Sequence, residues 1–347
     1  MFFKKLYKVG AGTLSITLVI LALANSLPSQ KVVKLFPKIG KSEPRNSLSG
    51  RIGADGPILV VKIDDTPAAH PQAGLEDADV VYIEQVEGGL TRLAAIFSSK
   101  IPKVVGPVRS ARISDIEILQ QYGRVAFAYS GAQKKLLPVI AAANLENLGA
   151  QRQSPQIYTS DPLRTAPTAM MLQAEKLMAN SVAANLMIAK SKSVGWSFGE
   201  SPDTGTAITS VKVSWPANSY DATWSSQESR WLLSHGGKPD IAASGVHLGP
   251  TTFVIQIVSI TLSEYYDKVG GVTPYSATVG AGTGYVLRDG IAVAATWKRS
   301  SADEGTTWTD KRGREIKFAS GQVWIALIDK EPLFTPKIAD APSPVTK

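Results

Sequence analysis

Charged side chains in the first half of the chain are grouped in a way that suits ligand binding or acid–base chemistry. Arginine presents a planar fork that pairs with a carboxylate or a phosphate through two hydrogen bonds. Two carboxylates about 5–9 Å apart can act as general acid and general base across a glycosidic bond. The candidate ligand-binding residues of this group are Asp64, Asp79, Glu84, Glu87, Arg92, Arg109 and Arg112.

Three interpretations of this group remain open: a binding cleft, a catalytic carboxylate pair drawn from Asp64, Glu84 and Glu87, and a structural ion network. Side chains alternate along the predicted strand 80–86, so Glu84 and Glu87 face opposite sides of it. The two carboxylates share a face only if Gly88-Gly89 introduces a bulge. In the structural interpretation, the acids satisfy the arginines at a domain seam.

The sequence gives no support to a metal site or a cofactor. The chain has no cysteine, which excludes thiolate metal ligands and disulfides. Its three histidines, His70, His235 and His247, include no pair at the spacing of metal ligands. Gly280–Gly284 is glycine-rich like a phosphate loop, but a strand rather than a helix follows it. We therefore predict no metal and no cofactor.

The positive charge of the chain is confined to its beginning. The net charge is +8, and residues 1–51 contain nine Lys or Arg against the single acid Glu43. The remaining residues are balanced, with 28 basic and 28 acidic side chains. A neutral body lacks the electrostatic footprint of a protein that binds a phosphate backbone. We expect no nucleic-acid partner.

The N-terminal segment has the pattern of an export signal or a membrane anchor. A basic start is followed by Val9–Leu27, which contains 19 residues without a charge. That length spans a bilayer as a helix, and Ala22-Leu23-Ala24 also fits a signal cleavage site. We predict a signal peptide or anchor over residues 1–27, with either anchoring by 9–27 or cleavage near Ala24. A flexible basic linker is expected over residues 28–56, and the body is expected to be extracytoplasmic.

The patterning of the body predicts an α+β protein with two domains. In the first half, apolar runs predict strands and 3.6-residue spacing predicts helices. The expected strands are 57–63, 80–86, 90–98 and 125–129, and the expected helices are 113–122, 132–143 and 168–189. We assign a mixed α/β domain with a layered sheet to residues 57–195, a predominantly β domain to 205–335 and a disordered tail to 336–347.

The second half is expected to be β throughout. The predicted strands are 210–215, 220–224, 229–234, 252–262, 284–287, 291–298, 307–309 and 323–328. All seven tryptophans lie at or after Trp196, and most tryptophans in a β domain belong to the core. The candidate for an exposed sugar-binding surface is Trp297 with Arg299, because strand alternation places these two side chains on one side.

Several strings match a known family in order and spacing. In the first half they are Ile63-Asp64-Asp65, Pro71-Gln72-Ala73-Gly74-Leu75, Ala78-Asp79-Val80-Val81-Tyr82, Val86-Glu87-Gly88-Gly89-Leu90-Thr91-Arg92 and Val105-Gly106-Pro107-Val108-Arg109-Ser110-Ala111-Arg112. In the second half they include Arg288-Asp289-Gly290 and Gly321-Gln322-Val323-Trp324. Over residues 50–330 the chain resembles the YerB-like family of bacterial envelope proteins, which have an N-terminal domain of unknown function and a β-rich C-terminal module.

The resemblance implies a compartment and an architecture but no reaction. Members of the family are exported, often as lipoproteins, whereas this chain has no cysteine to carry a lipid. It also has Thr168 in the segment Arg164–Ala169, where relatives have a histidine.

We expect an exported, non-enzymatic binding protein whose Asp/Glu/Arg-lined cleft holds a wall glycan, a peptide or an anionic polymer. The first alternative is a hydrolase or transferase that acts on envelope glycans through paired carboxylates. The second is a structural or assembly partner of envelope proteins. The expected partners are a cell-wall polymer or an envelope protein, and the membrane if the N-terminal segment is not cleaved.

Overall fold

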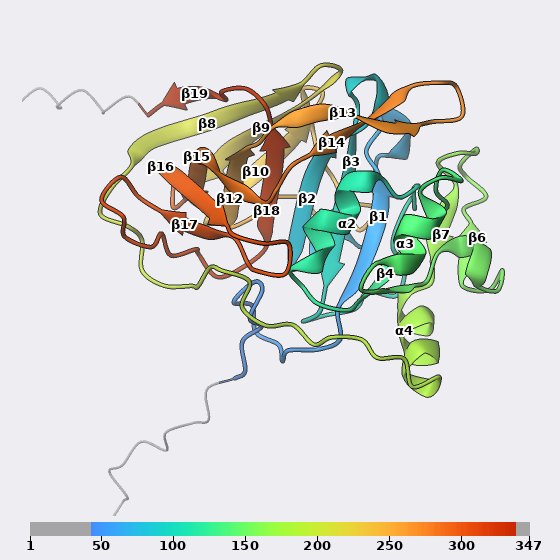
Figure 1. Ribbon diagram of the computed structural model, residues 1–347. Helices are drawn as coiled ribbons and strands as arrows, with labels where there is room; N and C mark the ends of the chain where they lie inside the picture. The colour runs from blue at the N-terminus through green and yellow to red at the C-terminus, as the bar shows by residue number, and fades with distance from the viewer. Residues whose placement is uncertain (1–42, 338–347) are drawn as a thin grey trace, which may run out of the picture. The chain divides into compact units, whose positions relative to one another are not determined.

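A computed structural model of the chain describes residues 43–337 (Figure 1). The predicted signal or anchor over residues 1–27, the first part of the predicted linker and residues 338–347 of the predicted tail lie outside the described residues. Within the described part, no helix has both the length and the apolar character needed to cross a membrane.

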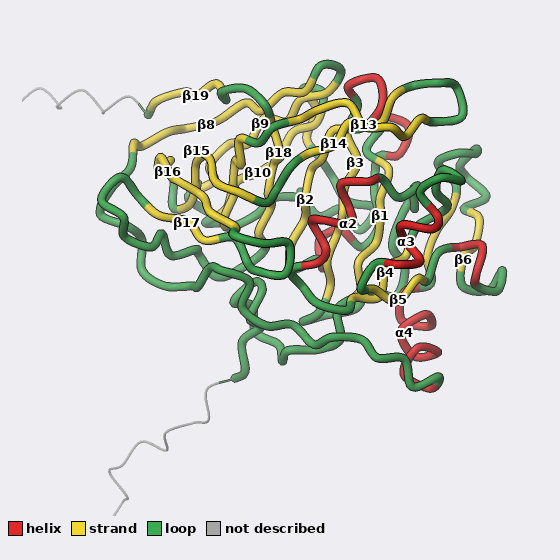
Figure 2. Tube along the Cα trace, in the orientation of Figure 1, coloured by secondary structure: helices red, strands yellow, loops and turns green. Residues whose placement is uncertain are grey.

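A single mixed β-sheet runs through both halves of the described chain (Figure 2). Its strands are, in order, β11 (Lys238–Pro239), β10 (Arg230–His235), β9 (Asn218–Ser225), β8 (Thr206–Trp215), β16 (Ile291–Arg299), β15 (Gly280–Arg288), β12 (Thr252–Ile257), β18 (Val323–Ile328), β2 (Val80–Gln85), β3 (Thr91–Phe97), β1 (Leu59–Asp64), β4 (Val125–Ala128) and β5 (Leu145–Asn147). In addition, β17 (Thr307–Thr309) pairs with β16, and β19 (Leu333–Pro336) pairs with β8.

Strand β18 joins the two halves. It is parallel to β12 on one side and to β2 on the other. All six of its residues are buried, as expected for a parallel strand covered on both faces. The first and second halves therefore share one hydrogen-bonded ladder.

The remaining elements surround this sheet. The helices of the described part are α2 (Ile113–Gln120), α3 (Leu137–Ala142) and α4 (Ala174–Ala183). Two small hairpins are formed by β6 (Tyr158–Ser160) with β7 (Met170–Leu172) and by β13 (Ile260–Tyr266) with β14 (Val272–Ser276). Four 3-10 turns cover Pro67–Ala69, Leu75–Asp77, Glu87–Gly89 and Ala150–Arg152.

Alternation along the strands divides the interior into two cores. In β1, Leu59, Val61 and Ile63 pack in one core, whereas Val60 packs in the other. Strands β8 to β10 fold back over the first core, where the Trp215 indole donates to the Leu327 carbonyl at 2.8 Å. Helix α2 covers the second core (Figure 1). Each face of the central strands is thus closed by a different part of the chain.

The α+β class and most predicted strands are confirmed. The predicted helix 168–189 is shorter, because residues 170–172 pair as β7 before the helix begins at Ala174. The predicted strand 252–262 is divided into β12 and β13, which belong to different sheets.

The prediction of a flexible linker is wrong for residues 43–56. In this segment Asn46, Leu48 and Ser49 are buried against the body. The Trp196 indole donates to the Leu48 carbonyl at 3.1 Å, and the Ser49 hydroxyl donates to Asp79 at 2.5 Å. The Pro, Ser and Gly content of this segment suggests a flexible coil, but hydrogen bonds with Trp196 and Asp79, which are distant in the sequence, hold it in place.

Candidate functional site

Three charged side chains form a row across the central strands. Glu84 on β2 lies directly opposite Arg92 on β3, and Arg92 lies opposite Asp64 on β1. All three are at least nine-tenths buried. Side chains directly opposite on one face of a sheet are close neighbours, and opposite charges in such pairs are favourable. The row lies on the face that α2 covers.

A buried lysine links this row to the helix. The Lys62 ammonium crosses the small Ala94 of β3 to contact the Glu84 carboxylate, and it also contacts the Asp115 carboxylate at 2.8 Å. Asp115 is in the first turn of α2, where it also accepts a hydrogen bond from the Arg112 backbone N–H at 2.6 Å. Negative charge is favourable at a helix N-terminus. Lys62 thereby fixes the start of α2 to the sheet.

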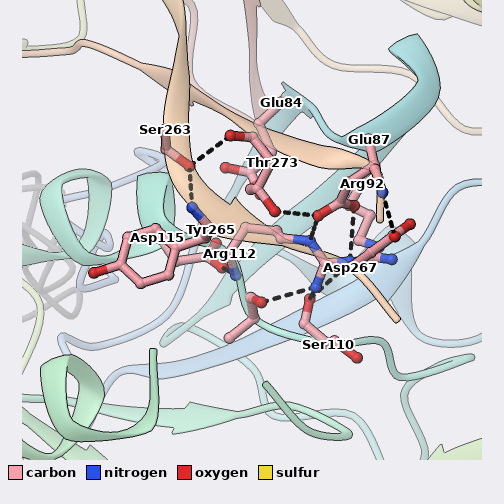
Figure 3. Close-up of polar contacts among 12 residues, drawn as sticks. Glu84, Glu87, Arg92, Ser110, Arg112, Asp115, Ser263, Tyr265, Asp267 and Thr273 are labelled. Carbon is pink, nitrogen blue, oxygen red and sulfur yellow. Dashed lines mark hydrogen bonds and ion pairs between the residues drawn. The ribbon is translucent and has the colours of Figure 1, made fainter. Parts of the chain in front are cut away.

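The turn after β2 brings Glu87 to the same side as Glu84 (Figure 3). Gly88 and Gly89 have φ of 68° and 73°, a left-handed conformation that only glycine adopts readily. Glu87 then accepts two contacts from the Arg112 guanidinium, at 2.6 and 2.8 Å, and one hydrogen bond from the Thr273 hydroxyl of β14. The bulge considered for Gly88-Gly89 does not form, because the β2–β3 register is unbroken up to Gln85 and Glu87 lies in the 3-10 turn that follows the strand.

Arg109 completes the group, which we call the arginine network: Asp64, Glu84, Glu87, Asp115, Lys62, Arg92, Arg109 and Arg112. The Arg109 Nε lies 2.8 Å from an Asp64 carboxylate oxygen. The Arg92 guanidinium donates to the Ser110 carbonyl at 3.0 Å. The Arg109 side chain is 25% exposed, whereas that of Arg112 is only 10% exposed. Arg109 is the more accessible of these two cations.

Burial and neighbouring charges shift the pKa values of the arginine network, raising that of Glu84 and lowering those of Glu87 and Arg92. Burial, followed by the nearby Asp115 carboxylate, raises the pKa of Glu84 to about 7, against the attraction of Lys62. Burial also opposes ionisation of Glu87, but the Arg112 guanidinium outweighs it and lowers the pKa of Glu87. Burial and Arg112 lower the pKa of Arg92 to about 9, so its guanidinium stays charged at neutral pH.

The arrangement resembles a structural ion network more than an acid–base pair. The three carboxylates that the sequence nominates for catalysis are each paired with a cation: Asp64 with Arg109, Glu84 with Lys62, and Glu87 with Arg112. A general acid must reach its substrate, and Glu84 is fully buried.

Asp79 lies apart from the network, at the opposite end of β2. It accepts hydrogen bonds from the hydroxyls of Ser49 and Ser99 and from the backbone N–H groups of Ser98 and Ser99, all between 2.5 and 2.8 Å. These contacts fix the N-terminal segment to the β3 end.

The expectation that Trp297 and Arg299 are exposed is wrong. Alternation does place them on one side of β16, but this side faces inward, so they are 3% and 0% exposed. The Trp297 indole donates to the Ile257 carbonyl at 3.0 Å. Arg299 donates to the carbonyls of Glu117 and Glu304 at 2.7 and 3.0 Å.

A cavity of about 400 Å³ lies beside α3 and was not found from the sequence. Its basic side chains are Lys134 and Arg152, and Asn147 and Gln151 supply amides. No carboxylate is among its lining residues, which are Tyr129, Lys134, Leu137, Pro138, Ala141, Asn147, Gly149, Gln151 and Arg152. Such a lining suits an anionic ligand.

A second polar group, the histidine cluster, lies on the opposite face of the sheet from the arginine network. It consists of Asp65, His70, His235 and Asp240. The His70 and His235 rings are stacked with centroids 4.3 Å apart. The two histidines are 165 positions apart in the sequence, so local spacing does not predict that they meet.

Arg164 holds the loop that carries His70. Its guanidinium donates to the carbonyls of Ala69 and Pro71, on either side of the histidine. The nearby Thr168 hydroxyl donates to the Thr165 carbonyl at 3.0 Å, so it caps its own loop.

Comparison with known proteins agrees with this architecture. One curated protein, “Putative lipoprotein YerB” of Bacillus subtilis (strain 168), is 52% identical over 56 residues, which are 16% of this chain and 17% of that protein. This similarity spans less than a fifth of the relative. The crystal structure of the YerB protein from Bacillus subtilis superposes with a TM-score of 0.71, covering 83% of this chain and 99% of that one. At 18% identity, this likeness shows the fold alone.

Family comparison covers both halves of the chain. Residues 47–187 match the N-terminal domain described as “Protein of unknown function (DUF3048)”, and residues 211–325 match the C-terminal domain of the same family. The two matched regions meet in the shared sheet at β2 and β18. The chain therefore belongs to the DUF3048 or YerB-like family.

Proposed function

We propose that this protein is an exported, extracytoplasmic binding protein that holds an anionic group of a cell-wall polymer, glycan or peptide. The uncharged segment 9–27 supports export. The name of the Bacillus subtilis relative, a lipoprotein, supports a location at the cell envelope.

The cavity beside α3 carries the proposal. Lys134 and Arg152 bring two positive charges to a hollow with no lining carboxylate to neutralise them. Its amide side chains can hydrogen-bond sugar hydroxyls, and the Tyr129 ring and Pro138 supply apolar surface for a sugar face. A ligand site typically combines an apolar lining with a few polar groups of this kind.

Arg109 is the second candidate contact for the ligand, and its backbone lies beside the segment that carries Tyr129. Its carbonyl accepts a hydrogen bond at 2.9 Å from the backbone N–H of Ser130, the residue after Tyr129. Within residues 43–337, its side chain pairs only through Nε with Asp64, which leaves its two terminal nitrogens available to a ligand. Arg92 and Arg112 are committed to the interior and have no such role in this proposal.

The test is sedimentation of the full-length protein, kept soluble in mild detergent, with isolated cell-wall material at low and high salt. A Lys134→Ala/Arg152→Ala variant is compared with a Lys176→Ala/Lys298→Ala variant, which removes the same charge from exposed positions elsewhere. We expect wild-type binding to weaken about tenfold or more in the cavity variant and to be unchanged in the control.

Two results contradict the proposal. Equal weakening in both variants would mean that general charge, not the cavity, drives association. Release of soluble wall fragments into the supernatant would show that the protein is a hydrolase or transferase and not only a binding protein.

A further inference from the structure

Three side chains of the histidine cluster converge on one point. The His70 Nε2 lies 3.5 Å from Asp65 Oδ1, and the His235 Nε2 lies 3.8 Å from Asp65 Oδ2. One ligand atom from each of these residues lies within 4.8 Å of the other two. Two ligands bound tetrahedrally to zinc at about 2.0–2.1 Å are separated by about 3.3 Å. Small side-chain adjustments therefore bring all three atoms to metal-binding distance.

A carboxylate outside this triad orients His70. The Asp240 Oδ1 lies 2.9 Å from the His70 Nδ1, and Asp240 is 1% exposed. When Nδ1 donates its proton to Asp240, the Nε2 of neutral His70 has a lone pair, and this atom lies 3.5 Å from Asp65 and 3.3 Å from the Gln72 amide nitrogen. Metal-binding histidines almost always have such a carboxylate or carbonyl partner on the other ring nitrogen.

Polar atoms around the triad lack partners. Within the described residues, the His235 Nε2, the Asp240 Oδ2 and the Gln72 Oε1 are buried and have no hydrogen bond. The His235 side chain is only 8% exposed. Buried polar groups are normally satisfied, so the unsatisfied His235 Nε2, which faces Asp65 Oδ2 at 3.8 Å, indicates a missing partner at the triad.

The charge balance calls for a cation. Asp65 and Asp240 are both buried, and among the described residues their only ion-pair partners are the two histidines. A buried carboxylate is costly unless it is paired or coordinates a metal. The Asp65 carboxylate is also fixed in position by hydrogen bonds that it accepts from the Tyr220 hydroxyl at 2.6 Å, from the Thr91 hydroxyl and from the Asn218 amide at 3.2 Å. His70, whose side chain is 18% exposed, leaves a route from solvent.

We propose that Asp65, His70 and His235 bind one divalent transition-metal ion, with zinc the best fit. Two imidazole nitrogens and one carboxylate form a three-ligand set of the kind that leaves a fourth position open to water or to a ligand. Imidazole favours zinc, copper or nickel over magnesium or calcium. Asp240 is a positioning residue, because it acts through His70.

The test measures Zn²⁺ binding to the untagged, full-length protein after chelator treatment. We expect one Zn²⁺ per chain and a higher thermal unfolding temperature with Zn²⁺. When Co²⁺ replaces Zn²⁺, we expect the visible absorption of a tetrahedrally coordinated ion. His235→Phe keeps an aromatic ring in the stack but removes the ligand, and we expect at least a 100-fold loss of affinity. Asp240→Asn should weaken binding about 10–100-fold.

His247→Gln is the matched control, because His247 is the third histidine of the chain and bonds the Leu233 carbonyl at 2.7 Å outside the triad. Its affinity for Zn²⁺ should equal that of wild type. The proposal is overturned if folded wild type binds no Zn²⁺ at micromolar concentrations, or if His235→Phe, folded by circular dichroism, binds as tightly as His247→Gln.

Discussion

The arginine network and the histidine cluster lie on opposite faces of the same strand end and differ in how their charge is balanced. Consecutive residues at the end of β1 supply both, because Asp64 points to one face and Asp65 to the other. The arginine network pairs its four carboxylates with basic side chains. The histidine cluster has two buried carboxylates and only histidines to meet them.

This difference in charge balance distinguishes a group that supports the fold from a group that can bind a ligand. A buried ion network that is internally balanced holds elements together, here α2, β1, β2 and β14. A buried group of carboxylates that has only histidines as basic partners remains unbalanced until a proton or a metal ion enters. Both contain charged residues in a buried setting, so residue type alone does not distinguish them.

The largest expected effect is that of removing the central cation of the arginine network. Lys62→Met leaves Glu84 and Asp115 buried without it, and breaking a buried ion pair costs about 3–5 kcal/mol. Urea unfolding should show this loss, and Lys62→Met/Glu84→Gln should recover part of it. A loss below about 1 kcal/mol in the single variant would mean that the network does not support the fold.

The next effect is a pH dependence caused by Glu84. Its pKa is raised from 4.5 to about 7 in the folded protein, so folding favours its protonated form. This contribution to stability is complete below about pH 4.5 and is lost as the pH rises through about 7, which amounts to about 3 kcal/mol.

The contribution of Glu84 protonation to stability can be isolated by measuring the unfolding free energies of wild type and Glu84→Gln from pH 4.5 to 8. The difference between the two proteins should shift in favour of Glu84→Gln as the pH rises. A difference that stays constant over this range would contradict the raised pKa.

A smaller effect is expected for Arg109→Ala. The substitution removes the basic partner of buried Asp64, but the Asp64 carboxylate keeps its hydrogen bond from the Thr66 backbone N–H at 3.0 Å. We expect a loss of about 2 kcal/mol in chemical unfolding. A loss as large as that of Lys62→Met would place Arg109 among the structural cations and remove it from the proposed binding surface.

The smallest effect on stability is expected for a substitution in the histidine cluster, on the opposite face of the sheet. In metal-free protein, His235→Phe replaces a ring whose Nε2 has no hydrogen bond, so the free energy of unfolding should change by less than about 1 kcal/mol. With saturating Zn²⁺, wild type should gain stability and His235→Phe should not. A large loss without metal would mean that the histidine cluster is also part of the framework.

Much of the fold follows from local patterns. Period-two alternation and short apolar runs predict most central strands, and Gly88-Gly89 signals the turn that follows β2. The burial of Trp297 does not follow from such patterns. Alternation shows which side chains share a face of the strand, but it does not show which face the rest of the chain covers.

The histidine cluster could not be predicted for a different reason. His70 lies in a loop after β1 and His235 ends β10, and the two meet only because β8 to β10 fold back over the sheet. Spacing rules for metal ligands apply within one helix or loop. They carry no information about residues that a tertiary contact brings together.

The position of β18 in the sheet has a consequence for the state of the chain during its synthesis. Residues 323–328 are synthesised more than 200 residues after β2, yet they pair with it. Until then β2 has an open edge whose backbone N–H and C=O groups can pair with any other extended chain. The nascent protein therefore exposes an unpaired strand edge while more than 200 further residues are made, and the arrival of β18 is the step that covers it.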